Sequence, residues 1–409
     1  MARVGERTGR PRLVWVVHQY GTEVGGGSET LCRQIAELLV DDVDSTVLST
    51  AARTYSDWSP QYPLGESTER GVRVIRFAAE PVDPGLRALY DQAFASPHDP
   101  DVGRRWLLGN GPNIPQLVAH LKSQSSEYDV LCSLPYVYPT TLLALETFTG
   151  PRVLVPCAHD EPALALSLYD EVFRSADVLV FNSEEEEELI ERRFGVLERP
   201  SRVIGTWIDR PPPVDARAFA ARYELEDPYV VSIGRLDMSK GTDLLLAVHA
   251  ETLGRTPPHT LVLVGHPYME IPDLPQLLVT GFVDEQTKQQ AIAGASAVIL
   301  PSPYESLSIV ALEGWTHGRP ALANADCPVL LGQCRRSGGG LWYHDANEYA
   351  HALTLLLTRS GFGNGLGASG RSWAIERYSR ERVRAAWLSV IRTAMESGRT
   401  RTLTVGATR

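Results

Sequence analysis

Short apolar segments alternate with stretches of helical periodicity along nearly the whole chain. The apolar segments are LVWVV (13–17), STVLS (45–49), VRVIRF (72–77), DVLCSL (129–134), RVLVPC (152–157), DVLVFN (177–182), YVVSIG (229–234), TLVLVG (260–265), LLVTGF (277–282), AVILP (297–301) and PALAN (320–324). Most are continuous runs of Val, Leu and Ile, as is typical of strands buried on both faces of a parallel sheet. The segments fall into two blocks, one over residues 13–182 and one over residues 229–324. Two such blocks predict an α/β protein with two doubly wound domains.

The pattern is interrupted between the two blocks. A run of three prolines at 211–213 breaks any periodicity, so we expect the domain boundary within residues 206–215. The first domain is predicted over residues 12–208 and the second over residues 209–379.

Four further segments carry weaker patterns. Residues 79–115 are rich in Pro, Gly and Asp and are expected to form a long irregular insertion, a type of segment that often serves as a lid or binding loop. The acidic run at 184–188 is expected to open a helix and to face solvent. An amphipathic helix is predicted over residues 380–395, and disordered tails are predicted over residues 1–11 and 396–409.

The composition excludes several classes of protein. The chain has 409 residues, 43% hydrophobic and 22% charged, as in an ordinary globular protein, and its formal charge of −11 argues against a nucleic-acid partner. No apolar run approaches the ~20 residues of a membrane helix, and the N-terminus lacks the apolar stretch of a signal peptide. Five scattered cysteines without a C-x-x-C pair indicate reduced thiols and no metal site. We therefore expect a cytoplasmic protein with at most weak peripheral membrane association; the oligomeric state is not indicated.

The segment PSPYESLSIVALEGWTHGRP, residues 301–320, is the most informative in the chain. It places a strand end before a polar turn with Glu305 and Ser306, followed by an apolar helix that carries Glu313. The helix N-terminus after a parallel strand favours anions, and the two carboxylates suit neutral hydroxyls. A sugar nucleotide offers both groups. The alternative is an ordinary strand–helix unit in which both glutamates are solvated.

A second strand–turn–helix segment, YVVSIGRLDMSKG at 229–241, places two cations after a buried strand that ends at Gly234. Arg235 supplies a planar fork and Lys240 a point charge, a combination that suits a diphosphate. The alternative is a solvated turn with a surface salt bridge between Asp237 and Lys240.

Together these segments resemble glycosyltransferase family 4, the retaining enzymes of the GT-B fold. The resemblance rests on Gly234-Arg235 with Lys240-Gly241 and on the Glu305-x7-Glu313 pair. It extends to GGGSE (25–29), the pair His159-Asp160, FNS (181–183) and GFVDEQTKQQAIAGASAVILPS (281–302). It implies two facing Rossmann-like domains with an interdomain cleft. The first would bind the acceptor and the second the nucleotide-sugar donor, and the final helix would pack back on the first domain.

The resemblance also implies roles at the leaving group. Arg235 and Lys240 would stabilise the departing diphosphate, helped by the backbone amides of Ser306 and Leu307 at the helix N-terminus. The family does this with protein cations, so no metal and no other cofactor is expected. Ser306-Leu307-Ser308 stands where many members have Gly-Phe-Gly, which keeps the backbone donors but changes the pocket and hence the donor sugar.

The sugar, ribose and base are assigned in the same way. Glu305 would bind hydroxyls of the transferred sugar and Glu313 those of the ribose. Phe282 and Val283 match the place where the family holds the base, and core packing is the alternative for both.

The first domain carries the remaining candidates. The loop at 25–29 would lie beside the diphosphate and the acceptor, with Gly26 and Gly27 near the donor and Ser28 and Glu29 near the acceptor. A plain flexible turn is the alternative. By resemblance, His159 lies beside the transferred sugar and is not the general base.

Two tyrosines and the predicted hinge complete the set of candidates. Tyr136 and Tyr138 are candidates for stacking on an acceptor sugar, with packing as the alternative. The family's hinge commonly reads Asn-Gly-Val-Asp, whereas residues 205–209 here read GTWID, and Trp207 at this point would restrict domain closure or contact a ligand.

The sequence thus predicts a retaining, metal-independent transferase that moves a sugar from a nucleotide-diphosphate sugar to a hydroxyl of a sugar-containing acceptor. A nucleotide-sugar epimerase or hydrolase on the same scaffold would instead turn over donor without acceptor. A catalytically weak sugar-nucleotide-binding subunit is the third hypothesis. A metal-dependent transferase using Asp42-Val43-Asp44 is discounted, because this triplet precedes its strand and lies on the wrong side of the sheet.

Overall fold

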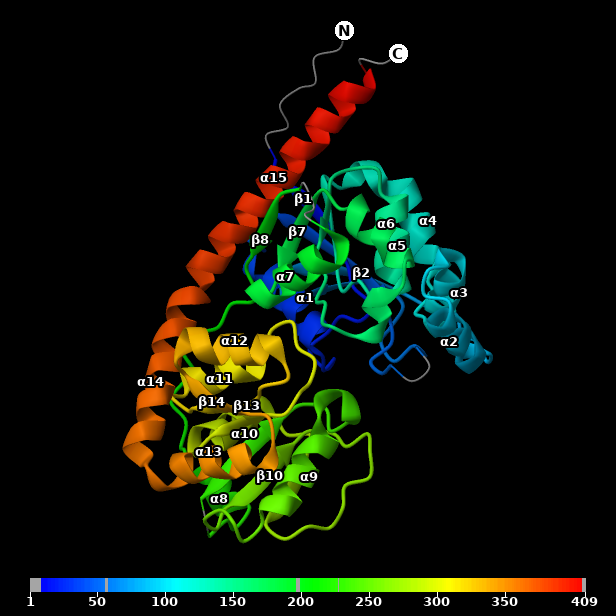
Figure 1. Ribbon diagram of the computed structural model, residues 1–409. Coiled ribbons are helices and arrows are strands. Elements are labelled where there is room, and N and C mark those ends of the chain that lie inside the picture. The colour runs from blue at the N-terminus through cyan, green and yellow to red at the C-terminus, as the bar shows by residue number, and fades with distance from the viewer. Residues whose placement is uncertain (1–8, 56–57, 196–198, 227, 407–409) are drawn as a thin grey trace. The chain divides into compact units, whose positions relative to one another are not determined.

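The computed structural model describes residues 9–55, 58–195, 199–226 and 228–406 (Figure 1). The chain forms two compact units. Unit 1 contains residues 1–206 and 383–409, and unit 2 contains residues 207–382. The predicted N-terminal tail lies outside the described residues as far as residue 8.

The first unit boundary falls at 206/207 rather than at 208/209, and local hydrogen bonds explain the difference. Thr206 is buried and donates to the side chain of Gln34 in unit 1. Two residues later, the amide of Ile208 donates to the carbonyl of Tyr378 in unit 2 (2.9 Å). Each side of the boundary is therefore fixed to its own unit.

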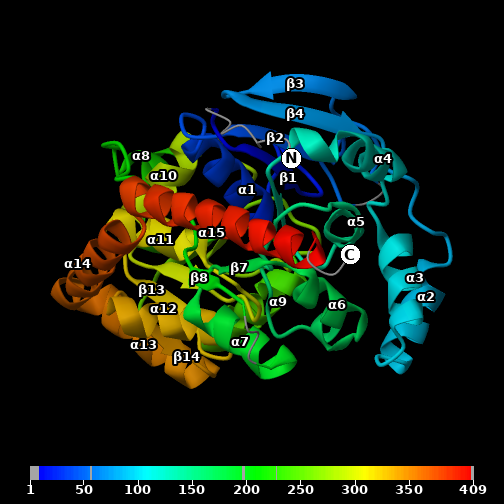
Figure 2. The same ribbon diagram turned by 90° about the horizontal axis from the view of Figure 1, so that it is seen from above.

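Unit 1 is built on a sheet with the strand order β3-β4-β2-β1-β5-β6-β7-β8. Its strands are β1 (Arg12–Val16), β2 (Asp44–Thr50), β3 (Gly65–Glu69), β4 (Val72–Phe77), β5 (Val130–Ser133), β6 (Arg152–Leu154), β7 (Val178–Phe181) and β8 (Ser201–Val203). All neighbours pair in parallel except β3, which pairs antiparallel with β4 at the sheet edge (Figure 2). The strand order reverses direction between β1 and β5, which makes this the topological switch point.

Helices α2 and α3 of unit 1 are not predicted from the sequence pattern. The helices that connect the strands of unit 1 are α1 (Gly27–Leu38), α2 (Leu86–Ala95), α3 (Pro100–Asn110), α4 (Pro115–Gln124), α5 (Pro139–Thr147), α6 (Leu168–Ser175) and α7 (Glu184–Phe194), with 3-10 turns η1 (Ser125–Glu127) and η2 (Pro162–Ala165). The prediction of an irregular insertion over residues 79–115 is wrong, since α2 and α3 lie side by side within it (Figure 2). Asp99 caps α3 by accepting from two backbone amides, and Pro100 occupies the first helical position, where proline is favourable.

Unit 2 has an all-parallel sheet with the order β11-β10-β9-β12-β13-β14. Its strands are β9 (Tyr229–Ile233), β10 (Thr260–Val264), β11 (Leu277–Gly281), β12 (Val298–Leu300), β13 (Ala321–Asn324) and β14 (Gly340–Tyr343). Its helices are α8 (Ala218–Arg222), η3 (Met238–Lys240), α9 (Thr242–Thr252), α10 (Glu285–Gly294), α11 (Ile309–Thr316), α12 (Pro328–Ser337), α13 (Ala346–Thr358) and α14 (Ser360–Arg377). Numbered within the unit, the strand order is 3-2-1-4-5-6, the doubly wound order with its switch point between β9 and β12.

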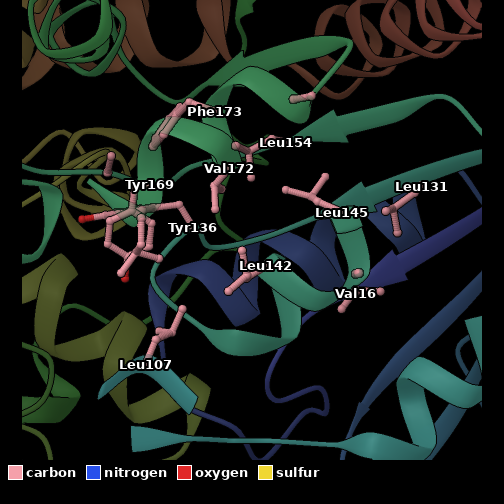
Figure 3. Packing of buried hydrophobic residues seen from close by; sticks show 14 of the residues in the cluster. Val16, Leu107, Leu131, Tyr136, Leu142, Leu145, Leu154, Tyr169, Val172 and Phe173 are labelled. Atoms are coloured by element: carbon pink, nitrogen blue, oxygen red, sulfur yellow. The ribbon is translucent and has the colours of Figure 1, made fainter. Parts of the chain in front are cut away.

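Apolar side chains fill both faces of each sheet. In unit 2, Val231 packs in the cluster on one face, whereas its neighbour Val230 packs in the cluster on the other. In unit 1, Tyr136 lies beside Tyr169 and Phe173 in the core (Figure 3). Burial of both faces explains why the strands read as continuous apolar runs.

Helix α15 (Arg380–Gly406) continues well beyond the predicted end at residue 395, so the disordered tail predicted from 396 is wrong as far as residue 406. Residues 407–409 lie outside the described residues. Gly398 lies within this helix and close to Pro151, since a Cβ there would sit 2.4 Å from the proline Cγ. Trp387 is buried against Trp15 of β1, with ring centroids 5.3 Å apart. These contacts make α15 part of the unit 1 core.

Within the described part of the chain, no helix is long and apolar enough to cross a membrane.

Candidate functional site

A tight turn after β9 presents the two cations predicted from the sequence. Asp237 caps η3 by accepting from the amide of Lys240 (2.9 Å) and from the hydroxyl of Ser239 (2.6 Å). Its other oxygen lies 3.2 Å from Nε of Arg235. Asp237 therefore pairs with Arg235 and not with the Lys240 ammonium, contrary to the surface salt bridge considered as the alternative.

Gly241 brings this turn against the loop after β12. It has φ +70°, and a Cβ there would lie 2.3 Å from the carbonyl oxygen of Pro301. Only glycine combines this left-handed conformation with so close an approach. As a result, Lys240 reaches Glu305, with Nζ 2.9 Å from Oε1.

A small open pocket of about 40 Å³ lies at the carboxyl ends of β9 and β12, the switch point of the sheet. Its lining includes Gly234, Arg235, Lys240 and Glu305. Lys240 and Glu305 are bonded to each other, so a ligand that binds either side chain competes with this ion pair. In doubly wound folds ligands bind at this position of the sheet.

The helix after Glu305 begins later than predicted. Its cap is Ser308, whose hydroxyl accepts from the amide of Ala311, so Ser306 and Leu307 lie in the loop and not in the first helical turn. The Ser308 amide is bonded to Gln333 (3.2 Å), and the Leu307 side chain packs in the core. The placement of the Ser306 and Leu307 amides at the helix N-terminus is therefore wrong, because the apolar periodicity cannot distinguish a cap serine from a helical one.

Glu313 lies in the second turn of α11 beside Lys288, a residue to which the sequence analysis gives no role. Lys288 of α10 places Nζ 2.7 Å from Oε1 of Glu313 and 3.0 Å from Oε2 of Glu285. Burial raises the pKa of Glu313, and the Lys288 ammonium opposes this shift.

Phe282 and Val283 differ in exposure. The Phe282 ring is 83% exposed at the carboxyl end of β11, so core packing is excluded for it. Val283 is half-buried against the core of unit 2. An exposed aromatic ring at this edge of the sheet leaves a flat apolar face open to a ligand.

In unit 1, the glycine-rich loop precedes α1, and Gly26 is its cap residue. Glu29 does not face outward from it. The carboxylate is buried and accepts from Ser28 (2.7 Å), from the Tyr55 hydroxyl and from His18 Nε2 (2.7 Å). Burial works to raise the pKa of Glu29, but His18 and the hydroxyl donors outweigh it and hold the value at about 2.

His18 is the central residue of this group and was missed by the sequence analysis. It follows β1, its ring is fully buried, and it stacks on Tyr138 with centroids 3.8 Å apart. Tyr138 is half-buried beside the loop, whereas Tyr136 is a core residue whose hydroxyl donates to Glu161 (2.9 Å). The structure thus favours the packing alternative for Tyr136. A polar residue two positions after a buried strand was the available clue to His18.

His159 lies in the loop after β6, with Nδ1 3.3 Å from Oε1 of Glu161. Nearby, Glu186 is fully buried and its two oxygens accept from the amides of Ala158 and Asn182, each at 2.6 Å. Burial raises the pKa of Glu186 to about 8, although these amides and His159 oppose the shift. The prediction that the whole acidic run at 184–188 faces solvent is wrong for Glu186, because the carboxylate closes two strand-end loops from inside.

Asp42 and Asp44 lie at the amino end of β2, opposite the carboxyl strand ends of unit 1. Asp44 is the first residue of β2, at its amino end, and Asp42 is bonded to Arg384 of α15. Among the described residues there is no group of three or more His, Cys, Asp or Glu side chains placed to hold a metal ion. The absence of a metal requirement stays a prediction.

Two units, each with a doubly wound sheet, define an α/β protein of the GT-B type, and solved structures share this fold. Sucrose-phosphate synthase from Thermosynechococcus elongatus superposes with a TM-score of 0.73 at 20% identity, covering 95% of this chain and 100% of that one. HepE from Anabaena, in complex with UDP and glucose, gives 0.68 at 15% identity, covering 94% and 100%.

Sequence comparison finds a family that is similar to part of the chain. Residues 227–359, all in unit 2, match the model of the glycosyl transferases group 1. The chain is 28% identical to a D-inositol 3-phosphate glycosyltransferase from Streptomyces bingchenggensis, over 98% of this chain and 92% of that protein. It is 29% identical to one from Nocardia farcinica over 50% of this chain, and spans about half of that relative's length (51%).

Proposed function

We propose that the protein is a retaining glycosyltransferase that moves a sugar from a nucleotide-diphosphate sugar to a hydroxyl of a sugar-containing acceptor. The observation that carries this proposal is the convergence of Arg235, Lys240 and Glu305 at the switch point of unit 2. The group 1 match covers all three residues. The presence of UDP and glucose in the Anabaena neighbour is consistent with a nucleotide-sugar donor.

The chemistry follows from charge. As the bond between the anomeric carbon and the diphosphate breaks, negative charge grows on the leaving oxygen, and Arg235 and Lys240 would stabilise it without a metal. Glu305, once its ion pair with Lys240 is broken, accepts hydrogen bonds from hydroxyls of the transferred sugar. The acceptor oxygen then bonds to the anomeric carbon on the face that the diphosphate leaves, and its proton passes to the leaving phosphate oxygen, so the configuration is retained.

The proposal extends to the base, the ribose and the acceptor. Phe282 and Val283 would hold the base, and Glu313 the ribose. The loop with Gly26 and Ser28, together with His159 and Tyr138, would serve the transferred sugar and the acceptor. Glu29 would act through the loop that it holds.

Thermal unfolding with UDP-, GDP-, ADP- and TDP-sugars, with chelator and then with magnesium, tests donor binding. We expect one nucleotide to raise the melting temperature equally with and without chelator, because ligands that bind the native state stabilise it. Transfer assays with the donor so identified then test the site. Lys240→Met and Glu305→Gln should each lower activity by roughly 100-fold or more, and NMR of the product should show the donor's anomeric configuration.

Lys122→Met, at an exposed lysine of α4, is the matched control and should leave activity unchanged. Near-normal transfer by both site variants would contradict the site assignment. Donor turnover without acceptor would favour an epimerase or hydrolase, and donor binding without any turnover would favour a binding subunit.

A further inference from the structure

We propose that Lys288 is a positioning residue for Glu313. It holds one oxygen of a half-buried carboxylate, so that the other oxygen, ionised and correctly turned, accepts hydrogen bonds from the hydroxyls of the donor's ribose. This inference rests on the proposed function, which gives the ribose to Glu313, and goes beyond it by assigning a role to Lys288, which has none in the proposed function.

The geometry divides the two carboxylate oxygens of Glu313. Oε1 is 2.7 Å from Nζ of Lys288, and the two side chains are only 18% and 21% exposed. Throughout the described ranges no residue is hydrogen-bonded to Oε2, and this atom is not sealed inside the protein. One oxygen is therefore anchored and the other is left for a ligand.

The lysine also contacts a second carboxylate. Nζ of Lys288 is 3.0 Å from Oε2 of Glu285, one helical turn earlier on α10, and that glutamate is 70% exposed. The contact fixes the ammonium between two carboxylates that differ in depth. Glu285 also raises the pKa of Glu313, so the lysine must offset both burial and a second negative charge.

Other charged groups near α11 do not replace Lys288. His317, which follows α11, is bonded to Gln289 of α10, and its pKa is lowered to about 4 by burial and by Arg319, Arg371 of α14 and Lys288. It is neutral near pH 7. Arg319 is directed to the carbonyl of Ala293. The ammonium of Lys288 is thus the cation bonded to Glu313.

Ionisation matters because of what a ribose offers. Two neighbouring hydroxyls donate two hydrogen bonds, which a carboxylate accepts, whereas a protonated carboxyl presents a donor of its own. Loss of Lys288 would leave a half-buried carboxylate without its counter-ion, and such a group takes up a proton at higher pH. The ribose preference would then become dependent on pH.

The test uses the full chain with Lys288→Met and, as the conservative variant, Lys288→Arg. The carboxyl of Glu313 is titrated by ¹³C NMR, with Glu313→Gln to assign its signal. We expect Lys288→Met to raise the pKa of Glu313 by about one pH unit or more, and Lys288→Arg to keep it near the original value. A purely structural tie between α10 and α11 would not move this titration selectively.

Binding of UDP, GDP and ADP is then compared with that of their 2′-deoxy forms between pH 6 and 9. Wild type should prefer the ribose form throughout. In Lys288→Met the preference should fall about tenfold at low pH and recover as the pH rises, whereas Lys288→Arg should retain it.

The outcomes separate this inference from the proposed function. An unchanged Glu313 titration, or an undiminished ribose preference in Lys288→Met, overturns the inference alone. Wild-type protein that binds nucleotides without preferring ribose also overturns it. Wild-type protein that binds none of the nucleotides overturns the proposed function itself.

Discussion

At the scale of single residues, burial has its largest effect on the carboxyl of Glu186. Glu186 is enclosed between the loops after β6 and β7, and its raised pKa of about 8 reflects the cost of ionising it there. In the unfolded chain the same carboxyl titrates near 4.5. Between pH 4.5 and about 8, the folded protein therefore keeps a proton on Glu186 that the unfolded chain has lost.

This difference predicts how stability depends on pH. The contribution of Glu186 is fully present below pH 4.5 and is lost as the pH rises through about 8, because the native state binds more protons. Glu186→Gln should lower stability at low pH, since an amide has one acceptor oxygen for two backbone amides. It should also flatten the decline of the melting temperature between about pH 4.5 and 8.

Thermal melts across this range check the prediction. Glu188→Gln, at an exposed position of the same helix, is the control and should keep the wild-type slope. An unaltered slope in Glu186→Gln would show that another group causes the decline.

The sequence predicts the site residues that follow strand ends and turns, but it does not predict which charged side chains are buried or which partners they bind. Arg235, Lys240 and Glu305 follow buried strands, so their meeting at one sheet edge was predictable. Glu186 and Lys288 were not predictable in the same way. A run of acidic residues does not reveal which one points inward, and the partners of Lys288 come from two separate helices.

At the scale of elements, the turn from η3 to α9 determines where Lys240 lies. Gly241→Ala should destabilise unit 2 by more than the roughly 1 kcal/mol of left-handed strain, because the new Cβ would clash with Pro301. It should also weaken stabilisation by the donor nucleotide, since the clash moves Lys240 away from Glu305.

The chain offers a matched control for this prediction. Gly254 has a similar φ of +74°, but a Cβ there would meet nothing within 4 Å. Gly254→Ala should therefore show the strain without the clash and leave nucleotide binding intact. Equal losses in the two variants, measured by thermal melts with and without nucleotide, would contradict the close-approach argument.

The elements missed from the sequence have identifiable physical reasons. β3 reads GESTE, an exposed polar edge strand without an apolar run. α2 and α3 lie in a segment rich in proline and glycine, residues that usually interrupt helices, but Pro100 begins α3 instead of ending it. Continuous Val and Ile runs were sufficient for the buried strands, because those strands are covered on both faces.

At the scale of the whole molecule, unit 1 is completed by the far end of the chain. Trp387 of α15 packs on Trp15 of β1, and both rings are buried. Trp387→Ala should cost roughly 3–5 kcal/mol in the stability of unit 1. In denaturant unfolding followed by probes in each unit, the unit 1 transition should shift and the unit 2 transition should stay.

Trp342→Ala serves as the counterpart, because Trp342 of β14 is 37% exposed in unit 2. Its effect should be small and confined to unit 2. A shift of both transitions by Trp387→Ala would mean that the units do not unfold separately.

The late position of α15 in the chain has a consequence for synthesis. Asp42 and Arg384, which form a bidentate ion pair in unit 1, are 342 positions apart in the sequence. While a ribosome makes the protein, the early strands emerge with the indole of Trp15 uncovered. Unit 2 is then complete before α15, the helix that covers this indole, has been synthesised. We therefore expect the nascent first unit to depend on chaperones until translation reaches α15, whereas the second unit folds as it emerges.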